Sequence, residues 1–273
     1  MWLPETEKVL NILSKEEGIK DYVFVGGSAL SYYLNHRLSE DIDLASPNEF
    51  LKMDGHIDKI MSNIFNKGFN VEESVESSAH SASKLIFYIN DVKVEFWASI
   101  ENNFLSTERT SLKNNLNIAS LDTLIGMKTA VIHHREVIRD YYDLYVITKE
   151  FGLKKAINEA DRLYNKKVDG REYFKFDETD FFKYAVNLKG VESEGVDSEL
   201  APKYKVNRRQ IESFLREEIE KYAINKFNRI EKELSQPKPE NNPSIMPESN
   251  TPKQDDFTRD LESKQTHKRK FGR

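Results

Sequence analysis

The strongest constraint on the fold is a short apolar segment that ends in two glycines and is followed, one helix later, by a second short strand. Residues 22–25 (Tyr-Val-Phe-Val) have the length and composition of a buried strand, which Gly26 and Gly27 end. Residues 28–36 predict a helix, with the serine at its start as N-cap, and residues 42–45 predict the second strand. This strand–helix–strand order favours a domain that mixes strands and helices.

The same segment carries groups that suit a nucleoside triphosphate. Gly26 and Gly27 let a ligand approach the backbone, and the free N–H groups of a helix that begins at Ser28 favour a phosphate. Asp41 and Asp43 lie two residues apart on a strand, so they point to one face, where their carboxylates repel each other unless a cation joins them. Mg²⁺ prefers oxygen ligands and bridges carboxylates to phosphates. Together these residues predict a Mg²⁺–NTP site.

A third acidic residue extends the predicted site. Residues 84–89 and 92–97, joined by an Asn-Asp turn, predict a β-hairpin, and Glu95 lies on its second strand. If that strand lies beside the strand of the two aspartates, three carboxylates converge. That number suits a two-metal site for in-line displacement at phosphorus. Taken alone, Glu95 fits an ordinary exposed strand residue as well.

Two basic residues have both a binding and a structural interpretation. Lys128 lies in the middle of a predicted helix among apolar or small residues, and burying a lysine there is costly without an anion. A triphosphate would supply that anion, whereas a side chain that extends to solvent would not need one. Arg37 is suited to bidentate phosphate binding, and it is equally placed to pair with Glu40 or Asp41.

Arg139 and Asp143 lie one helical turn apart. Side chains four residues apart on a helix are neighbours, so the two residues are expected to pair. The pair could be a simple helix ion pair. In the functional interpretation, Arg139 orients Asp143 or contacts a phosphate.

Helical patterns flank the strands of the first 120 residues. Amphipathic helices are predicted at residues 3–17 and 46–68, the second with Phe50 and Met53 on its apolar side. Residues 1–120 are therefore expected to form an α/β (α+β) core domain, with a mixed β-sheet flanked by helices.

From Ser120 onward the pattern becomes helical. Helices are predicted at residues 120–134, 136–150, 154–165, 178–187 and 207–234, with a loop at 191–205. The last helix has apolar residues at helical spacing from Ile211 to Leu234, which predict a buried stripe. Residues 121–234 are therefore expected to form a helical bundle domain.

The end of the chain has a different composition. Five of the eight prolines lie between Pro237 and Pro252, among Asn, Ser, Glu and Gln, so residues 235–273 are expected to form a disordered, Pro-rich tail. Residues 268–273 are basic and could contact nucleic acid or a partner; a solvated tail end is the alternative.

Composition excludes some classes of protein. The chain has no cysteine, which excludes disulfides and thiolate metal sites and leads us to expect a cytoplasmic protein. It has no apolar run of about eighteen residues, so no membrane-spanning helix is expected, and its N-terminus lacks the pattern of a signal peptide. The net charge of −5 gives no overall attraction to nucleic acid, so such binding requires a local basic surface.

Three segments together resemble a known family. Gly27-Ser28, followed after twelve residues by Asp41-Ile42-Asp43, is similar to the signature of the DNA polymerase β-like nucleotidyltransferase superfamily. The longer string, with Gly-Gly-Ser-Ala-Leu before His-Arg-Leu-Ser-Glu-Asp-Ile-Asp-Leu, resembles the AbiEii/AbiGii toxin family, which includes the MenT-type nucleotidyltransferase toxins. Lys128 and the Arg-Asp-x-x-Asp-Leu segment at residues 139–144 match further motifs of that family. The resemblance covers about residues 25–145.

The resemblance implies a fold and roles for individual residues. It implies a nucleotidyltransferase core in which Asp41 and Asp43 hold Mg²⁺ (or Mn²⁺), with two ions expected, and Gly27-Ser28 binds the triphosphate. Lys128 and Asp143 match positions for nucleotide handling and catalysis. Glu95 would be the third carboxylate, with glutamate in place of the more usual aspartate.

The expected reaction is metal-dependent transfer of a nucleotide from an NTP to an acceptor hydroxyl or phosphate, with release of pyrophosphate. Glu95 or Asp143 would act as base or complete the metal shell. The family implies an RNA acceptor such as tRNA, and a toxin role opposed by an antitoxin protein. Two alternatives stay open: a small-molecule, antibiotic-type nucleotidyltransferase and an NTP-binding module without turnover. A glycosyltransferase also uses an Asp-x-Asp motif to hold a metal–nucleotide complex. This class fits less well, because here the two aspartates follow the Gly-Gly-Ser turn by only one short helix.

Overall fold

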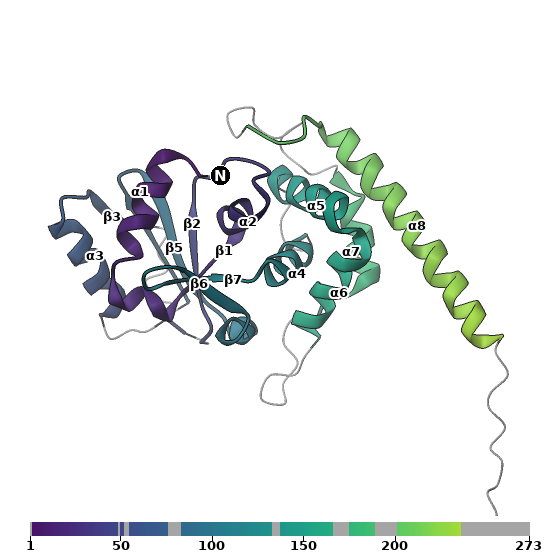
Figure 1. Cartoon of the computed structure of the whole chain (residues 1–273), viewed down its shortest axis with the longest axis horizontal. Helices are drawn as coiled ribbons and strands as arrows, with labels where there is room; N and C mark the ends of the chain where they lie inside the picture. The colour runs from purple at the N-terminus through teal and green to yellow at the C-terminus, as the bar shows by residue number, and fades with distance from the viewer. Residues whose placement is uncertain are drawn as a thin grey trace, which may run out of the picture. The chain divides into compact units, whose positions relative to one another are not determined.

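A computed structural model of the chain describes residues 2–48, 50–51, 55–75, 83–132, 137–165, 175–188 and 201–235. Residues up to Glu231 form one compact unit, and a second unit begins at Lys232. The first unit contains a mixed β-sheet flanked by helices, which confirms the predicted α/β (α+β) class (Figure 1). The described residues end at Ser235, so the rest of the predicted tail lies outside them.

The sheet contains both parallel and antiparallel neighbours, in the order β3-β4-β5-β2-β1-β7-β6. Its strands are β1 (Val23–Val25), β2 (Ile42–Ser46), β3 (Val71–Glu73), β4 (Lys84–Ile89), β5 (Val92–Ala98), β6 (Arg109–Lys113) and β7 (Leu116–Ala119). Strand β2 pairs antiparallel with β1 and parallel with β5, while β7 pairs parallel with β1. The two strands that carry the acidic residues, β2 and β5, are therefore neighbours in the middle of the sheet.

The predicted hairpin is confirmed as β4 and β5. Asn90 and Asp91, between the two strands, have φ angles of 46° and 65°. A two-residue turn of this kind requires positive φ at both positions, and Asn and Asp tolerate it better than most residues. The local turn chemistry therefore explains why the hairpin could be predicted.

The helices follow the predicted order. Those of the first half are α1 (Pro4–Leu13), α2 (Gly26–Leu34) and α3 (His56–Asn66), with short 3₁₀ segments at Glu17–Asp21 and Ile100–Ser106. Those of the second half are α4 (Leu121–Val131), α5 (Ile138–Phe151), α6 (Leu153–Tyr164), α7 (Glu178–Ala185) and α8 (Arg208–Leu234). Ser120 caps α4 as expected, because its side chain accepts a hydrogen bond from the N–H of Thr123.

The helix predicted at residues 46–68 is wrong in its first half. Strand β2 continues through Ser46, and the helix begins only at His56, after Gly55 in the left-handed conformation with φ of 73°. Phe50, predicted on the apolar side, is exposed, and Met53 lies outside the described residues. A left-handed glycine cannot continue a right-handed helix, so Gly55 separates the two segments.

The buried stripe predicted along the last helix is also wrong beyond its first turns. Ile211 and Leu215 are fully buried, but Ile224, Phe227 and Ile230 are 61%, 65% and 44% exposed. The spacing of the apolar residues is helical, as predicted, but these side chains stay exposed, although Lys226 in the same stretch pairs with Glu178 of α7. Periodicity identified the helix without identifying what it packs against.

The buried hydrophobic residues form two clusters. The first joins the sheet with α1, α2 and α3, and the second joins α5, α6, α7 and the start of α8. Helix α4 contributes Leu124 and Ile125 to the first cluster and Ala130 to the second. A domain boundary at residue 120 stays a prediction. Among the described residues, no helix is long and apolar enough to cross a membrane.

Candidate active site

The parallel pairing of β2 with β5 brings two of the predicted carboxylates together. Asp43 and Glu95 are partners in the register of the two strands. Asp41, at the start of β2, lies on the same side, and all three acidic residues line one polar pocket of about 430 Å³. The predicted convergence of three carboxylates on one site is therefore present in the structure.

Cationic side chains surround the carboxylates. Lys93 and Lys84 lie 3.0 and 3.3 Å from the Glu95 carboxylate. Lys128 and Arg139 line the same pocket as the acids. The pocket therefore combines negative charge for cations with positive charge for anions, as a metal–triphosphate complex requires.

Gly26 and Gly27 lie directly against charged side chains of the site. Gly26 has φ of 76°, and a Cβ atom there would overlap the Asp43 carboxylate. A Cβ atom on Gly27 would overlap the guanidinium of Arg37. Both glycines are therefore required by the side chains that lie against them.

Helix α2 begins two residues earlier than predicted. It starts at Gly26, with Val25 as its N-cap, so the prediction that Ser28 caps the helix is wrong. The Ser28 hydroxyl is buried, donates a hydrogen bond to the carbonyl oxygen of Asp41 and lies 2.7 Å from Oγ of Ser39. Ser28 thereby ties the start of α2 to the segment that carries the aspartates. Gly27 and Ser28 still line the pocket, and the N–H groups in the first turn of α2 have no partner within the helix.

Arg37 pairs with Asp143, and not with Glu40 or Asp41. Its Nε and Nη2 lie 2.8 and 3.0 Å from the two oxygens of the Asp143 carboxylate, a bidentate geometry. His36 adds a third contact, with Nε2 2.7 Å from Oδ1 of Asp143. All three side chains are buried. This contact joins the loop before β2 to helix α5.

Lys128 is buried with two protein anions beside it. Its Nζ lies 2.7 Å from Oδ1 of Asp140 and 2.9 Å from Oδ2 of Asp143. Two aspartates of α5 therefore already supply anions for Lys128, and its contact with a triphosphate stays a prediction. Lysine has three N–H donors, so a third can still reach a ligand.

The charges of this cluster keep Asp143 ionised. Burial by itself would raise the pKa of Asp143, but Arg37, Lys128 and His36 outweigh it and hold that pKa well below its usual range. Burial lowers the pKa of His36 in spite of the neighbouring carboxylate. His36 is therefore neutral at pH 7 and donates its Nε2 proton to Asp143.

Arg139 does not pair with Asp143. Its Nη1 lies 3.9 Å from Oε2 of Glu40, and both side chains are largely exposed. The predicted helix pair is wrong because Asp143 faces inward and takes its partners from other elements. Arg139 lines the polar pocket, so its contact with a phosphate stays a prediction.

The site raises the pKa of Asp43 instead of lowering it. Burial raises its pKa from 3.8 to about 6, and the nearby Glu95 and Asp41 add to that rise. Between pH 4 and 6 the unfolded chain is already ionised at this position while the folded protein keeps its proton, so stability falls as the pH rises through this window.

We therefore expect Asp43→Asn to raise the thermal midpoint of the metal-free protein at pH 7.5 and to have little effect at pH 4. The free-energy gain should be on the order of 1–2 kcal/mol, because Asp43 keeps some contact with solvent. Thermal unfolding at the two pH values measures it. An equal shift at both pH values would show that the ionisation of the buried Asp43 is not its cause.

The described residues contain no ready-made cluster of three or more His, Cys, Asp or Glu side chains around a cation position. The donor set nevertheless fits Mg²⁺ or Mn²⁺, because Asp41, Asp43 and Glu95 present carboxylate oxygens to one pocket, where burial first, and then the charges of Glu95 and Asp41, raise the pKa of Asp43. A cation at this position would relieve the repulsion between these charges.

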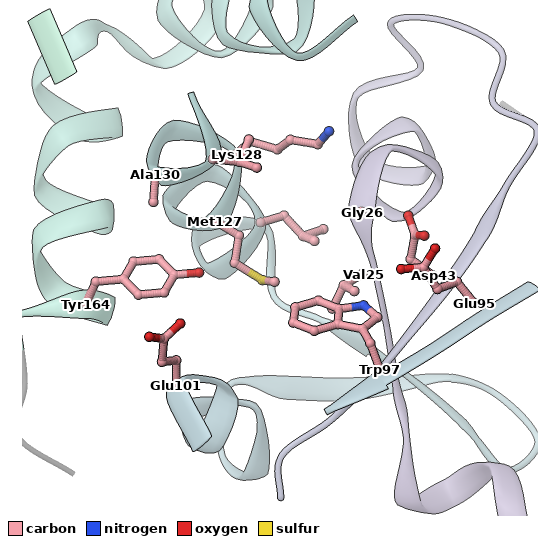
Figure 2. A pocket seen from close by; sticks show the side chains of 12 residues that line it. Val25, Gly26, Asp43, Glu95, Trp97, Glu101, Met127, Lys128, Ala130 and Tyr164 are labelled. Atoms are coloured by element: carbon pink, nitrogen blue, oxygen red, sulfur yellow. The ribbon is translucent and has the colours of Figure 1, made fainter. Parts of the chain in front are cut away.

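A second pocket of about 320 Å³ adjoins the first (Figure 2). Asp43, Glu95 and Lys128 line both pockets, while Trp97 and Tyr164 line only the second. Neither Tyr164 nor His36 was expected in the site. The signal for Trp97 was present, since it shares a strand face with Glu95; for Tyr164 the sequence offers none, because it comes from the end of α6.

Comparison with known proteins adds a family to this geometry. A model of the family described as "Nucleotidyl transferase AbiEii toxin, Type IV TA system" matches residues 8–257. An uncharacterized protein from Aquifex aeolicus (strain VF5) is 24% identical over 211 residues, which are 75% of this chain and 89% of that protein.

Two solved structures are also similar. MenT4, a nucleotidyltransferase toxin from Mycobacterium tuberculosis H37Rv, has 16% identity and a TM-score of 0.48, covering 78% of this chain and 81% of its own. The Megavirus polyadenylate synthase has 14% identity and a TM-score of 0.35, covering 66% of this chain and 36% of its own. The family model spans most of the sequence and includes every acidic and basic residue of the site described above. The chain belongs to the AbiEii family of nucleotidyltransferase toxins.

Proposed function

We propose that this protein transfers a nucleotide from an NTP to RNA, tRNA being the expected class, in a reaction that depends on Mg²⁺ or Mn²⁺. The observation that carries the proposal is the polar pocket, in which Asp41, Asp43 and Glu95 lie with the start of α2 and with Lys128. Carboxylates beside a helix N-terminus and a cation suit a metal–triphosphate complex.

Each part of the pocket has a role in this proposal. Asp41, Asp43 and Glu95 would hold the metal ions, which neutralise the triphosphate and polarise the reacting phosphoryl group. The N–H groups at Gly27 and Ser28 bind the phosphates, and the third N–H of Lys128 adds a charged donor. In-line attack by an acceptor hydroxyl then releases pyrophosphate.

The contacts argue against Asp143 as the group that receives the acceptor's proton. Both oxygens of Asp143 are engaged by Arg37 and Lys128, and its pKa lies well below the usual range, so it is a poor base. Asp143 instead positions Arg37 and Lys128 at the edge of the pocket. Arg37 also donates to the carbonyl oxygen of Leu38, so its guanidinium serves chiefly to hold the loop before β2.

The family adds a biological role to the proposal. Its description places it in type IV toxin–antitoxin systems, and we propose that this protein is the toxin of such a system, opposed by an antitoxin protein.

Incubation of the protein with each α-³²P-labelled NTP, Mg²⁺ and total bacterial RNA tests the reaction. We expect label on RNA with at least one NTP, and loss of that label when EDTA removes the metal. A panel of small hydroxyl compounds, assayed in parallel, serves as the control for acceptor class. Label on a small molecule alone would contradict the RNA acceptor, and NTP binding without transfer to any acceptor would contradict turnover.

A further inference from the structure

The second pocket begins where the first one ends. Asp43, Glu95 and Lys128 line both, so these three side chains mark the boundary between the two spaces. A nucleotide whose phosphates occupy the polar pocket would reach the second pocket with its nucleoside. Figure 2 shows that the second pocket runs from Asp43 and Glu95 past Trp97 to Tyr164 and Glu101.

The walls of the second pocket differ from those of the first. Its residues from α4 are apolar, apart from Lys128 at the boundary, and the indole of Trp97 faces them from strand β5; the apolar lining residues are Val25, Trp97, Leu124, Met127, Ala130 and Val131. A nucleobase is flat and apolar on its faces, and an aromatic ring provides a stacking surface for any base. The space therefore matches a nucleoside better than it matches phosphate.

The far end of the pocket is polar. Figure 2 shows the Glu101 carboxylate at this end beside the Tyr164 ring, whose hydroxyl points into the pocket toward Met127. Glu101 is held at the first turn of a 3₁₀ segment, where its N–H donates to Oγ of Ser99. The Tyr164 ring packs edge-on against Phe104 at 5.7 Å. Burial, together with the Glu101 carboxylate, raises the pKa of Tyr164, so its hydroxyl keeps its proton.

We propose that this pocket binds the base of the incoming NTP, stacked on Trp97, and that Glu101 selects bases that carry an exocyclic amino group. The proposal rests on the proposed function for the position of the triphosphate. A carboxylate only accepts hydrogen bonds, so it favours the amino donors of guanine, adenine and cytosine. Uracil has no exocyclic amino group, so it can offer the carboxylate only its ring N3–H, and its carbonyl oxygens cannot donate to Glu101.

Equilibrium binding of ATP, GTP, CTP and UTP in Mg²⁺, without acceptor, tests this assignment by calorimetry. We expect the protein to bind UTP at least about tenfold more weakly than its best amino-bearing nucleotide. In Glu101→Gln that ratio should fall below about threefold, because an amide both donates and accepts. Trp97→Leu should weaken all four nucleotides about tenfold without changing their order.

Glu73→Gln, the same substitution at an exposed position on strand β3, is the matched control and should leave the ratio unchanged. Circular dichroism and the thermal midpoint confirm that each variant folds. Equal affinity for UTP and the amino-bearing nucleotides, or an unchanged ratio in Glu101→Gln, would overturn the proposal. Unchanged NTP binding in Trp97→Leu and Glu101→Gln, together with a raised KM for RNA, would also overturn it. That result would assign the pocket to the acceptor.

The two proposals can fail separately. One outcome is that the protein discriminates against UTP, loses that discrimination in Glu101→Gln, and still transfers no nucleotide to any acceptor. This result contradicts only the proposed reaction. Transfer to RNA with no discrimination against UTP contradicts only the base pocket.

Discussion

Replacing Asp41 and Asp43 together by alanine is expected to lower nucleotidyl transfer by more than about 10³-fold, while the protein stays folded. The two aspartates supply two of the three carboxylates in the polar pocket, and they repel each other in the metal-free protein. Their loss removes the cation site and relieves that repulsion. Transfer of label to RNA measures the first effect, and thermal unfolding measures the second.

A matched control separates this effect from a general loss of negative charge. Asp58 and Asp180 lie exposed on α3 and α7, and their replacement by alanine removes the same charge elsewhere. That variant should transfer at close to the unmodified rate. Activity retained in the Asp41/Asp43 variant, or lost equally in the control, would remove these aspartates from the reaction.

Asp143→Ala is expected to have the largest effect on stability, about 3–5 kcal/mol, with a thermal midpoint lower by roughly 10 °C. The substitution leaves Arg37 without its bidentate partner and takes one of two anions from Lys128, and both cations are buried. An uncompensated buried charge costs far more than an exposed one. Thermal and denaturant unfolding measure the difference.

Asp143→Asn keeps the size and the hydrogen-bond acceptor of the side chain, so its effect should be intermediate. Glu40→Ala, at the exposed contact with Arg139, is the comparison and should cost less than about 1 kcal/mol. If Asp143→Ala cost no more than Glu40→Ala, the buried cluster would not hold the two halves of the site together.

The acidic half of the site could be predicted because its signals are local. The two glycines, the spacing of Asp41 and Asp43, and the hairpin that carries Glu95 each depend on neighbouring residues. The convergence of the three carboxylates depended on β2 and β5 being neighbours, which no local pattern predicts. The pairing of Asp43 with Glu95 in the sheet meets that condition.

The basic half of the site could not be predicted in the same way. Arg37 and Asp143 are 106 residues apart, and no local pattern indicates which of several acidic residues an arginine will meet. The sequence places Arg139 one turn from Asp143, but the inward direction of Asp143 depends on how α5 packs. The exposed part of α8 shows the same limit, because periodicity gives a face and not its partner.

The contact between Arg37 and Asp143 has a consequence for the protein while it is being synthesised. A nascent chain that has not yet reached α5 contains Asp41, Asp43 and Glu95. It lacks Asp140 and Asp143, which pair with Lys128 and, in the case of Asp143, with Arg37. Such a fragment carries the acidic residues without the contacts that fix the loop before them. Premature termination or proteolysis between β7 and α5 would therefore yield fragments without the complete pocket, and the proposed transfer reaction would require a ribosome to reach at least the end of α5.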